Sequence, residues 1–86
     1  MILSYQMVKK VYVSVIAQFN LDDSITPVQV LWHDGRTLEI DKVLDYRQII
    51  HCNSGGFAER YTVRIRNKEK YLFYAHPKWF VEIPNQ

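Results

Sequence analysis

The residues best suited to chemistry lie next to one another at His51 and Cys52. A thiol beside an imidazole is the pair that a cysteine nucleophile uses. Successive side chains of an extended segment point to opposite sides, so His51 is badly placed to act as the base for Cys52. We therefore expect no catalytic residue and no enzyme activity.

A metal site would have to combine these two residues with His33 and His76. The four residues show none of the short paired spacings that place two ligands on one ion. Ser54-Gly55-Gly56 is too short for a phosphate-binding loop and lacks the lysine and helix that follow one. The sequence therefore predicts no metal and no cofactor.

A local acidic cluster consists of Glu39, Asp41 and Asp45. A calcium loop needs a denser, glycine-hinged pattern, so we interpret the cluster as a solvated strand edge. Asp41 lies between two apolar runs at an expected bend, where its carboxylate can accept backbone N–H bonds and fix the corner.

The remaining candidate site is a basic, aromatic hairpin in the second half of the chain, where residues 46–86 hold seven basic and three acidic side chains. Its candidate binding surface consists of Arg60, Arg64, Arg66, Lys68, Lys70 and Tyr71. Small β-barrels bind single-stranded nucleic acids with such cations and aromatic rings. However, the net charge of +2 is low for a dedicated nucleic-acid binder, and alternating arginines on an outward strand face also serve solubility.

We therefore expect a protein-interaction or assembly module without catalytic activity, whose partner is an unknown protein or a second copy of the chain. A weak nucleic-acid-binding barrel that uses the basic hairpin is the alternative. No apolar run approaches the ~18 residues that span a bilayer, and the single cysteine excludes an intrachain disulfide. Both features favour a cytoplasmic protein that binds no membrane.

The elements that must position these residues are strands. The chain has 17 valines and isoleucines but only nine alanines and leucines, a balance that favours β structure. Apolar and polar residues alternate from Val11 to Phe19, and further strands are expected over 28–32, 38–50, 61–65, 71–74 and 79–83. The sequence leaves open whether the run over 38–50 bends at Asp41-Lys42. We expect an all-β fold, a small, strongly twisted sheet of five or six antiparallel strands that closes into an SH3-like or similar barrel. Trp32 and Trp79 should both be largely buried in its interior.

Turn-forming residues separate these strands. Asp34-Gly35 predicts a two-residue hairpin turn with a positive φ at its glycine. The glycines and asparagine of residues 52–56 predict a flexible loop.

The register of the basic hairpin decides which way its aromatic residues face. A two-residue Asn67-Lys68 turn pairs Arg64 with Tyr71 and places arginines and aromatics on one outward strip, whereas a one-residue shift turns Tyr71 and Phe73 into the core. Both registers are compatible with the sequence. Because enclosing a large side chain contributes ~1.5–3 kcal/mol, we favour the register that buries both aromatics.

Three segments carry a resemblance to known proteins, and they read Trp-His-Asp-Gly-Arg at 32–36, Ile-Asp-Lys-Val-Leu-Asp at 40–45 and Trp-Phe-Val-Glu at 79–82. The chain resembles, over roughly residues 11–82, a group of short uncharacterised Gram-positive bacterial proteins. The resemblance implies a stand-alone cytoplasmic protein and brings no catalytic residue with it. Such proteins begin near Met7, so we expect residues 1–8 to be a disordered N-terminal extension and residues 9–84 a single β-barrel domain.

Overall fold

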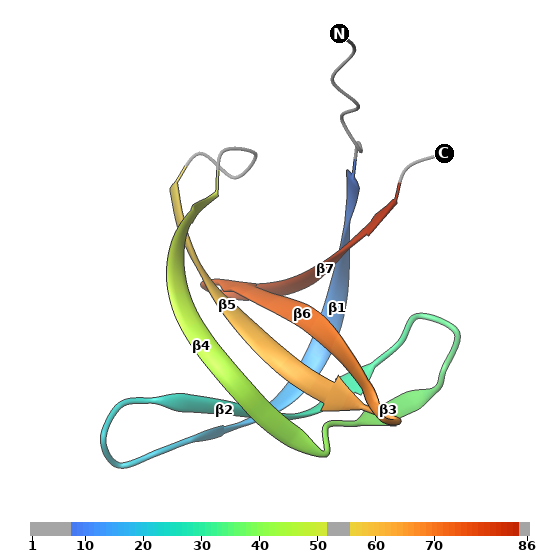
Figure 1. The fold of residues 1–86 in the computed structure, drawn as a ribbon, viewed down its shortest axis with the longest axis horizontal. Helices are drawn as coiled ribbons and strands as arrows, with labels where there is room; N and C mark the ends of the chain where they lie inside the picture. Colours follow the sequence, from blue (N-terminus) through green and yellow to red (C-terminus); the bar gives the residue numbers. More distant parts are fainter. Residues whose placement is uncertain (1–7, 52–55, 85–86) are drawn as a thin grey trace, which may run out of the picture.

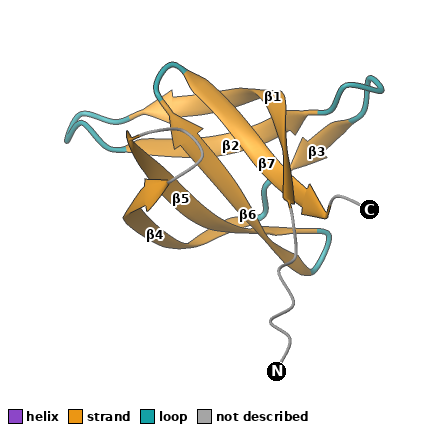
Figure 2. Ribbon diagram, turned by 90° about the horizontal axis from the view of Figure 1, so that it is seen from above, coloured by secondary structure: helices purple, strands orange, loops and turns teal. Residues whose placement is uncertain are grey.

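The structure is a computed structural model that describes residues 8–51 and 56–84. It contains seven strands, β1 (Val8–Phe19), β2 (Ile25–Leu31), β3 (Thr37–Glu39), β4 (Lys42–His51), β5 (Gly56–Ile65), β6 (Lys68–Ala75) and β7 (Lys78–Pro84). The described residues form no helix, and so none with the length and apolar character to cross a membrane (Figure 2). The predicted all-β fold is confirmed.

All seven strands belong to one antiparallel sheet in the order β3-β2-β1-β7-β6-β5-β4, which curls into a half-barrel (Figure 1). Every neighbouring pair is consecutive in the sequence except β1 and β7, the first and last of the described strands. The expectation of five or six strands in a closed barrel is wrong. There are seven strands, and the described residues of the end strands β3 and β4 do not pair with each other.

The seventh strand arises because the run expected over 38–50, whose bend at Asp41-Lys42 the sequence leaves open, is divided at Ile40 and Asp41 into β3 and β4. The amide of Ile40 donates a hydrogen bond to Val28 O (2.9 Å), and the amide of Asp41 donates one to Arg64 O (2.8 Å). These bonds tie the chain first to β2 and then to β5, so it passes between the two edges of the sheet within two residues. Asp41 thus fixes the corner through its backbone amide, whereas its carboxylate, expected to accept bonds there, is exposed.

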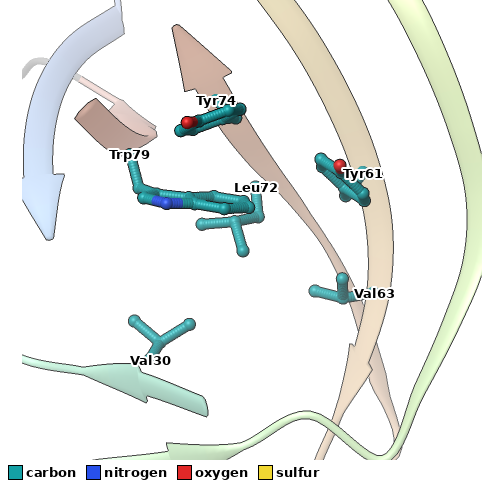
Figure 3. Close-up of a cluster of buried hydrophobic side chains, with 6 residues drawn as sticks. All are labelled: Val30, Tyr61, Val63, Leu72, Tyr74 and Trp79. Carbon is teal, nitrogen blue, oxygen red and sulfur yellow. The ribbon is translucent and has the colours of Figure 1, made fainter. Parts of the chain in front are cut away.

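The inner face of the curled sheet holds the main core. Its buried members are Val30, Tyr61, Val63, Leu72, Tyr74 and Trp79. The Tyr74 and Trp79 rings lie with their centroids 4.4 Å apart, and the Tyr61 ring is 5.6 Å from Trp79 (Figure 3). Trp79 is therefore buried as expected, whereas Trp32 is only half-buried and packs against the edge of this core.

Two further aromatic side chains are buried on the outer face of the sheet. Phe73 and Phe80 are cross-strand neighbours on β6 and β7, and they are 5% and 0% exposed. Their rings stack with centroids 5.0 Å apart, and Nζ of Lys10 lies 4.6 Å from the centroid of Phe80. The sheet therefore carries apolar clusters on both faces.

The turn between β2 and β3 is one residue longer than expected. The amide of Trp32 donates to Arg36 O (2.8 Å), and the amide of Gly35 donates to Trp32 O (2.9 Å), so three residues separate the bonded pair. Gly35 has a φ of +92°, which confirms the predicted positive φ, because the last residue of such a three-residue turn is left-handed. The loop predicted over 52–56 lies outside the described residues apart from Gly56, the first residue of β5.

Candidate binding surfaces

The turn of the basic hairpin sets the register of β5 and β6. Arg66 and Asn67 form this turn with φ values of +52° and +64°, and Ile65 pairs with Lys68. Two left-handed residues give a two-residue turn whose twist matches that of the flanking strands. The predicted Asn67-Lys68 turn is therefore wrong by one residue.

This register places Tyr71 opposite Thr62 and Phe73 opposite Arg60, on the outer face of the sheet. The prediction that the register turns Tyr71 and Phe73 into the core is therefore wrong. Phe73 is buried nevertheless, because Phe80 stacks on it from β7. Tyr71 remains 53% exposed.

Arg60 and Tyr71 form a close pair on this outer face. The guanidinium carbon of Arg60 lies 4.5 Å from the centroid of the Tyr71 ring. Such a cation–π contact contributes ~0.5–1 kcal/mol at an exposed site. Within the described part of the chain, the buried Nε atom of Arg60 has no hydrogen-bond partner and the side chain forms no ion pair, so its observed partner is the Tyr71 ring.

The six residues expected to form one binding surface do not share one face. Three point outward from the sheet (Arg60, Arg64 and Tyr71), one lies in the turn (Arg66), and two occupy inner-face positions (Lys68 and Lys70). Lys70 and Tyr71 belong to the edge of a groove that the sequence does not reveal.

This groove exists because β6 and β7 pair over a short distance and then diverge (Figure 1). They pair at three positions, from Phe73 to Ala75 on β6. On its other side β6 pairs with β5 as far as Lys68. Between Lys68 and Leu72 the β6 edge that faces away from β5 therefore has no strand partner in the described part of the chain.

The hydrogen-bonding alternation of an antiparallel pair identifies the groups on this edge. The two-residue turn makes Ile65 and Lys68 a hydrogen-bonded pair, so every second residue from Lys68 to Leu72 directs its N–H and C=O toward β5. The N–H and C=O groups of Glu69 and Tyr71 point to the opposite edge, toward β7.

The space between the diverging strands, named here the β6–β7 groove, has a volume of about 770 Å³. Its floor reaches the core and includes the apolar side chains of Val30, Trp32, Leu38, Val63, Leu72 and Val81. The charged residues Arg36, Glu69, Lys70 and Glu82 also line it. An apolar cleft with a few polar groups at its edge is the usual form of a binding site.

A second, smaller pocket lies between the β1–β2 turn and the β4–β5 hairpin. Tyr46 Oη donates a hydrogen bond to Glu59 Oε1 at 2.7 Å, and this bond raises the pKa of Tyr46 because ionisation would break it. Burial raises the pKa of Tyr61, whose ring centroid is 5.0 Å from that of Tyr46. None of the three residues belongs to a sequence motif, and only their cross-strand register brings them together.

The residues weighed for other chemistry are dispersed. Among residues 8–51 and 56–84, no three His, Cys, Asp or Glu side chains gather closely enough to hold a metal. Asp45 pairs with Arg47 at 3.0 Å, and Glu39 accepts a hydrogen bond from Gln29, so these carboxylates make separate surface contacts. Cys52 lies outside the described residues.

Three comparisons with known proteins, a scan against protein-family models, a search of curated proteins and a search of solved structures, each find no match to this chain.

Proposed function

We propose that this protein is an interaction module that binds an extended segment of a partner protein in the β6–β7 groove. The observation that carries the proposal is the β6 edge, where the backbone groups of Glu69 and Tyr71 have no strand partner among the described residues and lie beside an apolar groove. An unpaired edge next to apolar pockets is the geometry through which a peptide adds a strand to a sheet.

The bound segment lies along β6 and extends the sheet toward β7. Its backbone bonds the N–H and C=O groups of Glu69 and Tyr71. Alternate side chains of the segment point to opposite faces, so every second one reaches the groove floor at Val30, Leu72 and Val81. Each large apolar side chain that is enclosed there contributes roughly 1.5–3 kcal/mol before the entropy lost on binding is counted.

The charges around the groove indicate the chemistry of the partner. The seven residues from Arg64 to Lys70 include four basic side chains and one acidic side chain, that of Glu69. Arg36 pairs with Asp34 at 2.6 Å, whereas Lys70 has no ion-pair partner among the described residues. A segment with alternating apolar residues and a carboxylate at the end nearest the β5–β6 turn therefore fits best.

The test selects short peptides from a random displayed library against the folded protein. We expect the selected peptides to alternate apolar and polar residues and to carry Asp or Glu near one end. A synthetic copy of a selected peptide should slow the hydrogen exchange of the Glu69 and Tyr71 amides, because binding turns both into ladder bonds.

Two arginine substitutions provide a matched comparison for that peptide. Ile83 lines the groove and is 37% exposed, whereas Ile50 on β4 is 74% exposed and does not line it. Ile83→Arg should weaken binding at least about tenfold, while Ile50→Arg should leave it unchanged. The proposal fails if no peptide is selected, if the peptide protects other amides, or if the two variants bind it equally.

The outward register of the basic hairpin supports a second candidate function, weak binding of single-stranded nucleic acid. Tyr71 shares its face with Arg60 and Arg64, and a ring beside cations is a surface on which bases stack. The guanidinium of Arg60 already covers this ring, which reduces the area left for a base.

Short labelled single-stranded DNA and RNA oligonucleotides measured across a salt series test this candidate. Micromolar binding that weakens steeply with salt and is lost in the Arg64→Glu, Arg66→Glu double variant would favour nucleic acid over a protein partner.

A further inference from the structure

The pocket between the β1–β2 turn and the β4–β5 hairpin shares no lining residue with the β6–β7 groove. Its volume is about 300 Å³, the lower end of the range for small-molecule sites. Two carboxylates line it, those of Asp23 and Glu59, and its lining contains no Lys, Arg or His. The site therefore suits a small cation and disfavours an anion.

The Glu59 carboxylate is held in place by a hydrogen bond but can accept further hydrogen bonds. Its Oε1 atom accepts the hydrogen bond from Tyr46, and a carboxylate has room for several further donors. No ion pair to Glu59 occurs within the described ranges. The negative charge is thus oriented by a neutral hydroxyl and is available to a positively charged ligand.

Tyr61 supplies the second, independent indication of a ligand. The residue is 3% exposed and lines the pocket, yet its hydroxyl takes part in none of the hydrogen bonds found among the described residues. Among the described residues the fully buried polar atom without a partner is Arg60 Nε, so the Tyr61 hydroxyl keeps some contact with solvent and its oxygen is free to accept a hydrogen bond from a ligand. The neighbouring Tyr46 hydroxyl, in contrast, is already bonded to Glu59.

We propose that this pocket binds an alkylammonium group. The N–H donors of the ammonium bond the Glu59 carboxylate and the Tyr61 hydroxyl oxygen, and its charge faces the Tyr46 and Tyr61 rings, which attract cations. The aliphatic part of the ligand packs on Ile25 and Val43, the apolar residues of the lining. A metal ion fits less well, because no three ligating side chains gather among the described residues.

The probe for the first test is n-butylammonium chloride, titrated into the ¹⁵N-labelled protein and followed by NMR. We expect saturable shifts at the backbone amides of Tyr46, Glu59 and Tyr61 with a dissociation constant in the millimolar range, as suits a single charged group. Sodium chloride at the same ionic strength and uncharged n-butanol should not produce these shifts. Absence of saturable shifts with n-butylammonium would overturn the proposal.

Two pairs of variants locate the interaction. Glu59→Gln removes the charge and keeps the shape, and it should weaken binding at least about tenfold. Tyr61→Phe keeps the ring and should weaken binding about fivefold. The controls Glu69→Gln and Tyr71→Phe make the same chemical changes on the hairpin and should have no effect. Parent-like affinity in Glu59→Gln, a variant whose partly exposed site does not challenge folding, would refute the assignment.

The ammonium group can come from a free amine or from a lysine side chain, and a third titration separates these sources. Nα-acetyl-lysine N-methylamide should bind several times more tightly than n-butylammonium if the ligand is a lysine of another protein, and equally if it is a free amine. Its Nε-acetylated form carries no charge and should not bind. Equal binding of the charged and the Nε-acetylated forms would contradict an ammonium site.

Discussion

Phe80→Leu tests the apolar cluster on the outer face of the sheet. Phe80 is fully buried and stacks on Phe73. The substitution removes about three carbon atoms from water-free surroundings, at roughly 0.8 kcal/mol each, and the ring stacking, worth ~0.5–1.5 kcal/mol. We expect the free energy of unfolding to fall by about 3–4 kcal/mol, which lowers the melting temperature by about 15–30 °C in a domain of this size.

Urea unfolding followed by tryptophan fluorescence measures this change, because Trp79 adjoins Phe80 in the sequence and is buried. The matched control is Phe57→Leu, since Phe57 is 75% exposed and should lose less than about 0.5 kcal/mol. A double-mutant cycle with Phe73→Leu should give a coupling energy of ~0.5–1.5 kcal/mol. Equal destabilisation by the Phe80 and Phe57 substitutions would refute a packed outer cluster.

Three further predictions concern turns and tyrosines. Gly35→Ala should destabilise the fold by about 1–2 kcal/mol in urea unfolding, because φ there is +92°, and a neutral result would contradict the three-residue turn. Replacing Arg66-Asn67 by Asn-Gly should raise the melting temperature by several degrees, since both positions are left-handed, and a lower value would argue against this register. The raised pKa values of Tyr46 and Tyr61 mean that the folded state keeps protons that the unfolded chain loses, so stability should fall as the pH rises above about 10. Ultraviolet titration should show that these two phenols ionise at a higher pH than an unperturbed tyrosine. Ionisation of all six tyrosines near pH 10 would disprove the raised pKa values.

Regular alternation makes some strands easy to predict. The segment from Val11 to Phe19 lies within β1 because its apolar side chains meet one core on one face. Alternation is less informative at Ile40 and Asp41. The apolar spacing changes from two to three residues between Ile40 and Val43, which indicates a bend, but only the bonds to β2 and β5 reveal that the chain changes partners there.

The basic hairpin was harder to predict for a different reason. Leu72, Phe73 and Tyr74 are consecutive, apolar and all buried, so no alternation identifies the inward face. The argument from burial assumes a single core, and it fails because Phe80 creates a second one on the outer face. A left-handed arginine in the turn, Arg66, is also uncommon enough to escape sequence reasoning.

Neither candidate site has a local sequence signal. The β6–β7 groove depends on how far two strands diverge, which is a property of the twisted sheet and not of any segment. The small pocket combines Ser24 from the β1–β2 turn with Tyr46 and Glu59 from the β4–β5 hairpin. Each residue alone is an ordinary surface or strand residue, and only the assembled sheet brings them together.

The pairing of β1 with β7 has a kinetic consequence. The other five neighbouring pairs of the described sheet join consecutive strands and can form as local hairpins within about 1–10 μs. The β1–β7 pair instead joins Val13 to Trp79, and closing so long a loop costs about 1.5–2 kcal/mol more than closing one of about ten residues. We therefore expect the hairpins to form first and β1 to pair with β7 last. Formation of the β1–β7 pair is then the step that limits the folding rate.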